Sequence, residues 1–295
     1  MVKTIEKEEN RLDIKVEEYF VAFLDILGFK DYVDRYIEGD TAILKKIKSS
    51  MEEVTNNVEE RYFKSKNIKI KYKQFSDCTS ISLKNILNDD DINQNEFNYS
   101  LALIIIILRD FQYELLETDV YIRGAFSLGV HFENKNLIFS EALIKSYNLE
   151  LTEAMYPRII LDVTLFKYLK IMYKHHKDSM INLGIDQALV CDWDGLIFIN
   201  PFKKFESSKD FVKTEEYFKD ENEKMEFLCK LDKDFMSSTL QNVEKQIYNF
   251  KPLKKKSDYN KLRKYLWIKE LIKWNQDPKS SKIRFEKLEY EHFEV

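Results

Sequence analysis

Residues 18–29 read EYFVAFLDILGF, an almost unbroken run of aromatic and aliphatic side chains. A run of this kind, rich in aromatics and Val, is typical of a buried β-strand. Asp25 interrupts the run, three residues before Gly28. Because burying an unpaired carboxylate costs several kcal/mol, we interpret Asp25 as a cation ligand rather than as a residue that only hydrogen-bonds at a strand end.

The segments that follow have apolar residues at either helical or alternating spacing. In chain order we expect a helix at 43–58, a hairpin of two strands at 68–75 and 78–83 joined by a tight turn at Ser76-Asp77, a helix at 96–117 and a strand at 120–130. The order strand, helix, strand, strand, helix, strand predicts a ferredoxin-like βαββαβ core. This is an α+β fold with an antiparallel sheet and helices on one face.

Further α/β elements and a helical end are expected beyond this core. The pattern predicts a short strand near 137–140, a helix at 141–155, a strand at 158–163, a last strand within CDWDGLIFINPF (191–202) and amphipathic helices near 225–250 and 258–275. The expected organisation is a charged leader at 1–18, a catalytic core at 19–205, and a helical extension of the same domain, without a sheet of its own, at 206–295.

Composition narrows the class of protein. The 47 basic and 51 acidic residues nearly cancel, whereas proteins dedicated to duplex nucleic acid normally carry a basic excess. The longest apolar run, Leu101–Leu108, is far shorter than the roughly 20 residues that cross a bilayer. Cys78, Cys191 and Cys229 lie far apart and read as reduced thiols. We therefore expect a cytoplasmic protein that binds neither nucleic acid nor a membrane.

The expected topology brings two carboxylates to one edge of the sheet. In a ferredoxin-like core the first strand lies next to the hairpin, so Asp25 should approach Asp77 at the hairpin tip. Two close carboxylates repel each other, and Mg²⁺ prefers one or two carboxylates together with phosphate oxygens. Gly28 would let backbone N–H groups of the turn 26–29 face an anion. The residues alone thus predict metal-dependent triphosphate chemistry.

Several motifs, in this order, resemble one known family. FLDILGF (23–29), FSD (75–77) and RGAFSLG (123–129) are similar to the catalytic domain of class III nucleotidyl cyclases. The resemblance is closest to the bacterial pyrimidine cyclases of Pycsar anti-phage defence and covers roughly residues 19–200. Further motifs that share it are YNLE (147–150), YPRI (156–159), DWDG (192–195) and, near the end, KYLWIKELIKWN (264–275).

The resemblance implies an activity and a set of site residues. It implies a homodimer with active sites at the interface, which converts UTP or CTP, with UTP favoured, to the 3′,5′-cyclic monophosphate and pyrophosphate. The product would be a second messenger for a separate cyclic-nucleotide effector. The catalytic Asp25 and Asp77, with the Ile26 carbonyl, would hold two Mg²⁺ or Mn²⁺ ions, and Leu27, Gly28 and Phe29 would contact the substrate.

Two basic residues are candidates for contacts to the base. Lys73, four residues before Asp77, stands where purine cyclases place a base-reading residue, but it also fits the solvated face of a lysine-rich strand. Arg123 begins a strand that faces the nucleotide pocket in this family, and its alternative is a buried salt bridge. Either cation suits O2 or O4 of uracil and O2 of cytosine, so these residues do not select between the two bases.

The chain departs from purine cyclases at the residues that stabilise the transition state. Those enzymes carry an Asn and an Arg one helical turn apart, and alignment on Leu149-Glu150 gives Ile144 and Asn148 here. The candidate replacement cations are Lys145, Arg158 and Lys203. A purine cyclase, and a degenerate cyclase that only binds a nucleotide or a partner, stay open as alternatives. The presence of both acidic residues argues against the degenerate form.

Overall fold

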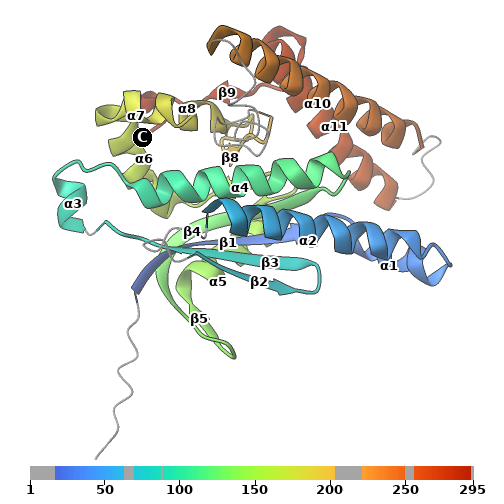
Figure 1. Ribbon diagram of the computed structural model, residues 1–295, viewed down its shortest axis with the longest axis horizontal. Helices are drawn as coiled ribbons and strands as arrows, with labels where there is room; N and C mark the ends of the chain where they lie inside the picture. Colours follow the sequence, from blue (N-terminus) through green and yellow to red (C-terminus); the bar gives the residue numbers. More distant parts are fainter. Residues whose placement is uncertain (1–16, 63–69, 88, 203–220, 250–255, 294–295) are drawn as a thin grey trace, which may run out of the picture.

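A computed structural model describes residues 17–62, 70–87, 89–202, 221–249 and 256–293 (Figure 1). Its strands are β1 (Glu17–Ile26), β2 (Ile70–Phe75), β3 (Cys78–Lys84), β4 (Ile122–Glu133), β5 (Ile138–Ser140), β6 (Ile159–Leu161), β7 (Leu189–Cys191), β8 (Ile197–Ile199) and β9 (Glu286–Lys287). Its helices are α1 (Phe29–Ile37), α2 (Ala42–Tyr62), α3 (Asp89–Asn93), α4 (Tyr99–Glu117), α5 (Glu141–Glu153), α6 (Phe166–His175), α7 (Lys177–Asn182), α8 (Ile185–Ala188), α10 (Glu221–Asn249) and α11 (Lys256–Gln276).

The strands of the described residues form one sheet in the order β2-β3-β1-β4-β6-β8-β7-β9, with β5 paired to the end of β4. The pairs β2–β3, β3–β1 and β1–β4 are antiparallel, and β4–β6 is parallel. The first four positions reproduce the strand order of a ferredoxin-like core, with α2 and α4 on one face (Figure 1). The predicted α+β fold is therefore confirmed.

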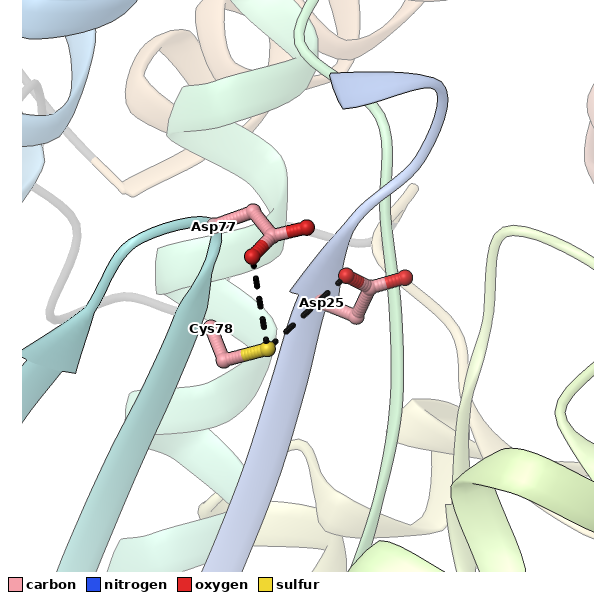
Figure 2. A group of neighbouring side chains, drawn as sticks. All are labelled: Asp25, Asp77 and Cys78. Atoms are coloured by element: carbon pink, nitrogen blue, oxygen red, sulfur yellow. Dashed lines mark hydrogen bonds between the residues drawn. The ribbon is translucent and has the colours of Figure 1, made fainter. Parts of the chain in front are cut away.

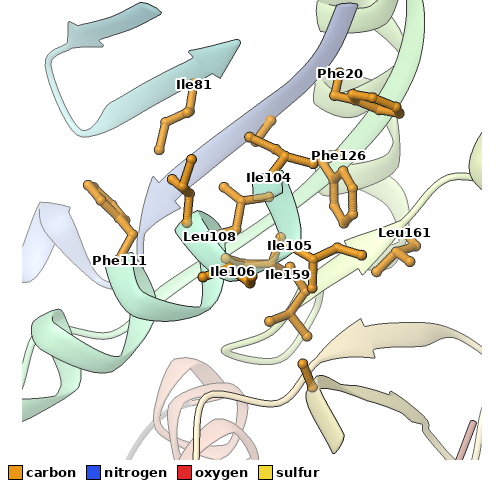
Figure 3. Close-up of a cluster of buried hydrophobic side chains, with 14 of the residues drawn as sticks. Phe20, Ile81, Ile104, Ile105, Ile106, Leu108, Phe111, Phe126, Ile159 and Leu161 are labelled. Atoms are coloured by element: carbon orange, nitrogen blue, oxygen red, sulfur yellow. The ribbon is translucent and has the colours of Figure 1, made fainter. Parts of the chain in front are cut away.

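The central strand β1 is buried on both faces, which explains its continuous apolar sequence. Phe20 and Leu24 belong to the large core that β1 shares with α2 and α4 (Figure 3). On the opposite face, Val21 packs against α5, and the Ser146 hydroxyl donates a hydrogen bond to the Val21 carbonyl at 2.7 Å. Helices therefore cover both faces around β1: α2 and α4 belong to the βαββαβ core, and α5 is an addition to it.

The helix α4 is apolar around most of its circumference because protein surrounds it. Ile104, Ile105 and Leu108 pack on the sheet in the core of Figure 3, while Tyr113 and Leu116 reach a second core beneath α10 and α11. The side chain of Asn98 caps the helix by accepting a hydrogen bond from the Leu101 N–H. In the part of the chain that the structure describes, neither α4 nor any other helix meets the length and apolarity of a membrane span.

The later strands differ from the sequence prediction. The segment 191–202, expected as one strand, instead contains the end of β7, a turn at Asp192–Gly195 and then β8, because Gly195 adopts a positive φ of 83° and reverses the chain. The region 206–295, expected to be a helical extension without a sheet of its own, also contributes β9, which joins the main sheet by pairing with β7. The predictions for residues 1–16, 68–69 and 203–220 concern residues that the structure does not describe.

Gly124→Ala should destabilise the protein because β1 and β4 approach closely at this point. A Cβ at Gly124 would overlap the backbone carbonyl oxygen of Phe23, so the strands must separate, at a cost of about 1–3 kcal/mol. The matched control is Gly129→Ala in the same strand, where the shortest contact of the added carbon is with the movable Glu141 carboxylate and the nearest backbone atom, the Ala142 nitrogen, is 3.3 Å away. Urea denaturation should give the larger loss for Gly124→Ala, and equal losses would contradict this explanation.

Candidate active site

Asp25 and Asp77 come together because two strand ends meet. Asp25, near the end of β1, pairs in register with Cys78, the first residue of β3, and Asp77 immediately precedes Cys78. The Ile26 N–H also donates a hydrogen bond to the Asp77 carbonyl at 3.1 Å, which fixes the hairpin turn against β1. One ligand atom from each of Asp25, Asp77 and Cys78 lies within 4.8 Å of the others (Figure 2).

Cys78 contributes a thiol to this group. Its Sγ lies 4.0 Å from Asp25 Oδ1 and 3.8 Å from Asp77 Oδ1. Burial, followed by the charges of Asp77 and Asp25, raises the pKa of Cys78 to about 12. The group thus offers two carboxylates and one thiol, and its carboxylate oxygens suit hard cations such as Mg²⁺ or Mn²⁺.

The Asp25 carboxylate is oriented by an arginine that two acids share. Arg123 Nε donates to Asp25 Oδ2 at 3.0 Å and lies 2.8 Å from Glu150 Oε1. Burial raises the pKa of Asp25, although Arg123 opposes the shift, and burial likewise raises the pKa of Glu150. The charge of Asp77 also raises the pKa of Asp25, and a divalent cation between these two carboxylates would relieve their repulsion. The donor set therefore fits a cation.

The turn after β1 leaves backbone donors at the start of a helix. Gly28 has a left-handed conformation, with φ 80° and ψ 19°, and stands at the N-cap of the nine-residue helix α1. The Leu27 N–H donates to the Tyr121 carbonyl at 2.8 Å and is occupied. Within the described part of the chain, the N–H groups of Gly28 and Phe29 make no hydrogen bond. A helix N-terminus with free N–H groups attracts anions.

Two of the other candidate residues have partners elsewhere in the chain. Lys73 donates to the Asn134 carbonyl at 2.6 Å and lies 3.5 Å from Glu133 Oε1, so its ammonium group sits on the β4–β5 turn. Lys145 forms an ion pair with Glu141 at 2.7 Å. Lys203 is outside the described residues.

Arg158 is buried and paired, which removes it from the set of candidate phosphate contacts. Its guanidinium donates to Asp192 and forms two hydrogen bonds to Asp194, at 3.1 and 2.5 Å. Only 1% of its side chain is exposed, so no phosphate could reach it without breaking these bonds. Trp267 of α11 donates to the same Asp192 carboxylate at 2.8 Å. Arg158 therefore joins β6, the β7–β8 turn and α11.

Sequence reasoning did not assign a role to residues that border Asp25. Glu150 was only part of a motif, yet it holds Arg123. Lys264 and Arg263 of α11 line a cavity of about 230 Å³ together with Arg123. The opposition of Asp25 and Cys78 follows from strand pairing and could have been inferred, whereas α11 gave no signal of its proximity because it is so distant along the chain.

No protein-family model and no curated protein matches the chain. Among solved structures, one of a bacterial light-regulated adenylyl cyclase is similar at 12% identity and a TM-score of 0.40, covering 68% of this chain and 98% of that one. A class III adenylyl cyclase-like ATP-binding protein from Pseudomonas aeruginosa is similar at 14% identity and a TM-score of 0.37, covering 54% of this chain and 37% of that one. At these values the similarity carries no inference about function.

Proposed function

We propose that this protein is a metal-dependent nucleotidyl cyclase that converts a pyrimidine nucleoside triphosphate to its 3′,5′-cyclic monophosphate and pyrophosphate. The observation that carries the proposal is the meeting of Asp25 and Asp77 beside the turn at Gly28 and the N-terminus of α1. Two carboxylates next to free backbone N–H groups suit a divalent cation that also binds phosphate oxygens.

Asp25, Asp77 and the Ile26 carbonyl would hold two Mg²⁺ or Mn²⁺ ions. When bound, these ions would lower the pKa of the ribose 3′-OH and neutralise charge on the triphosphate. The 3′ oxygen attacks the α-phosphorus in line, while the bond from that phosphorus to the oxygen bridging the α- and β-phosphates breaks. Pyrophosphate leaves with the electron pair of that bond, and the proton of the 3′-OH passes to solvent.

The chain's own residues would prepare this reaction by fixing the ligands in place. Arg123 holds Asp25 Oδ2, so the other carboxylate oxygen, Oδ1, stays on the side of Asp77 and Cys78, where a cation would bind. The bond from the Leu27 N–H to Tyr121 fixes the turn, which leaves the N–H groups of Gly28 and Phe29 for phosphate oxygens. Preorganised donors of this kind cost no reorganisation during the reaction.

The choice of a pyrimidine rests on the sequence resemblance to the Pycsar enzymes. UTP is favoured and CTP is the second pyrimidine, and the cyclic product would act as an anti-phage second messenger read by a separate effector. Lys73 stays a proposed base contact, and it would have to exchange the Asn134 carbonyl for a carbonyl of the base. The alternatives are a purine cyclase and a degenerate cyclase fold that binds a nucleotide without turnover.

The direct test is to incubate the purified protein with each of the four nucleoside triphosphates and Mn²⁺, and to identify the products by mass spectrometry. Cyclic UMP should be the main product. Cyclic AMP or cyclic GMP as the main product would support the purine alternative. Nucleotide binding by calorimetry without any cyclic product would contradict the proposed activity and favour the degenerate alternative.

We also propose that the active form is a homodimer, because α5 carries an exposed apolar stripe. Ile144, Tyr147 and Leu151 follow a helical spacing on α5, and two further exposed apolar residues flank the helix, Phe139 in β5 before it and Met155 after its end. Ile144 is 61% and Leu151 60% exposed, which is unusual for aliphatic side chains that line up on one face. A second copy of the chain is the occupant that the family resemblance implies.

Leu151→Glu should convert the dimer to a monomer, since it places a charge in the middle of the apolar stripe. Size-exclusion chromatography with light scattering should give twice the chain mass of 35.5 kDa for the wild type and a single chain mass for the variant. The control Thr152→Glu, one residue further and outside the stripe, should stay dimeric. A wild type that is monomeric at full activity would contradict the dimer.

A further inference from the structure

A cavity of about 230 Å³ opens beside Asp25, and its charged lining is entirely basic. Arg123, Arg263 and Lys264 line it together with Met155, Tyr156 and Asn260. Arg123 also binds Asp25 directly, at 3.0 Å, so the cavity and the carboxylate pair share one side chain. An anion placed here would share Arg123 with the carboxylate that is proposed to hold the cation.

The helix α11 is fastened against the turn that follows β1. Lys261 forms an ion pair with Asp31, in the first turn of α1, at 2.5 Å. The ring of Tyr265 packs edge-on against that of Tyr121, whose carbonyl accepts the Leu27 N–H. These contacts hold the first half of α11 beside the N–H groups at the start of α1.

Among the residues that the structure describes, no acidic side chain forms an ion pair with either of the two basic residues that α11 adds to the cavity. Arg263 Nη2 donates one hydrogen bond, to the Tyr156 hydroxyl at 3.3 Å. Lys264 is half-buried and makes no hydrogen bond or ion pair with the residues that the structure describes. Burial and the neighbouring Arg123 lower the pKa of Lys264, while Asp25 and Glu150 oppose the shift. Lys264 and Arg263 therefore keep N–H donors that an anion entering the cavity would accept.

An anion site on α11 would also account for a missing residue. The helix α5 has Asn148 where purine cyclases carry the arginine that stabilises the transition state. Of the replacement candidates within the described residues, Arg158 is buried against Asp192 and Asp194, and Lys145 pairs with Glu141. The cations that remain near Asp25 are Arg263 and Lys264, which belong to α11 instead of α5.

We infer that Lys264 and Arg263 of α11 bind the β- and γ-phosphates of the substrate and hold the pyrophosphate group as it leaves. This inference rests on the proposed cyclase activity and deepens it, because it assigns the charge stabilisation of the leaving group to the C-terminal helix. Charge-assisted hydrogen bonds to phosphate oxygens are about twice as strong as neutral ones, so each cation should contribute measurably.

The test is a calorimetric titration of pyrophosphate in the presence of Mg²⁺ into the wild type and single variants. Lys264→Met and Arg263→Met should each raise the dissociation constant about tenfold, the effect of losing one charge-assisted hydrogen bond. The matched control is Lys269→Met on the same helix, where the lysine instead pairs with Glu244, and it should bind like the wild type. Lys264→Arg should retain most of the binding.

Unchanged binding in both Lys264→Met and Arg263→Met would overturn the inference, as would an equal loss in Lys269→Met. Arg263 is exposed, so its variant should fold even if Lys264→Met does not. The cyclisation assay on the same preparations separates the two proposals. A wild type that binds pyrophosphate through these residues but makes no cyclic nucleotide would keep the anion site and remove the cyclase. A wild type that makes cyclic nucleotide, but whose variants bind pyrophosphate normally, would support the cyclase activity and contradict the anion site.

Discussion

Asp25→Asn and Asp77→Asn are each expected to lower the rate of cyclic-nucleotide formation by roughly 10³-fold, which corresponds to several kcal/mol of transition-state stabilisation. Each substitution keeps the shape of the side chain and removes one anionic ligand from a group whose atoms lie within 4.8 Å of one another. Calorimetric titration with Mn²⁺ should show weaker binding in parallel, because the remaining carboxylate holds a cation less well.

The two variants are not equivalent. Asp25 also accepts the hydrogen bond from Arg123, so Asp25→Asn loosens the cavity wall as well as the cation site, whereas no ion pair joins Asp77 to a cation within the described residues. Asp77→Asn is therefore the cleaner probe of metal binding. Asp34→Asn, an exposed acid on α1 paired with Lys30, is the control and should keep full activity. Full activity in Asp77→Asn would contradict the metal role.

The part of the site that sequence could predict is the part that strand pairing determines. The apolar run of β1 indicated a buried strand, and the predicted topology places the hairpin after it alongside. The end of β1 then had to meet the hairpin turn, which brings Asp25 to Asp77 without any knowledge of side-chain packing. Alternation with a period of two, and a two-residue turn, were sufficient signals for this geometry.

What sequence could not predict depends on contacts between distant elements. The YPRI and DWDG motifs were quoted separately, yet their charged residues bind each other: Arg158 with Asp192 and Asp194. Arg158 was consequently considered for phosphate binding, because a lone arginine in a sequence carries no sign of its partner. The Asp194-Gly195 pair was the available signal for the β7–β8 turn, but the apolar residues on both sides favoured one continuous strand.

The largest expected effect on stability comes from Arg158→Met, which should lower the free energy of unfolding by about 3–5 kcal/mol in urea denaturation. The side chain of Asp192 has no exposed surface, so removing the arginine leaves a buried carboxylate with hydrogen bonds only from Trp267 and the Trp193 N–H. Asp194 is 25% exposed and can turn to water. Lys30→Met, which breaks an exposed ion pair, should leave the unfolding midpoint unchanged.

The pH dependence of this loss identifies its cause. Burial already raises the pKa of Asp192, and Arg158 opposes that shift, so the pKa must rise further in Arg158→Met. A carboxyl whose pKa is higher folded than unfolded binds its proton more tightly in the native state, and stability then falls as the pH rises. The deficit of the variant should consequently be larger at pH 8 than at pH 5. The double variant Arg158→Met with Asp192→Asn should recover part of the loss and show little of this pH dependence. A deficit equal at both pH values would point instead to lost packing against Tyr156, Phe198 and Trp267, whose rings surround the guanidinium.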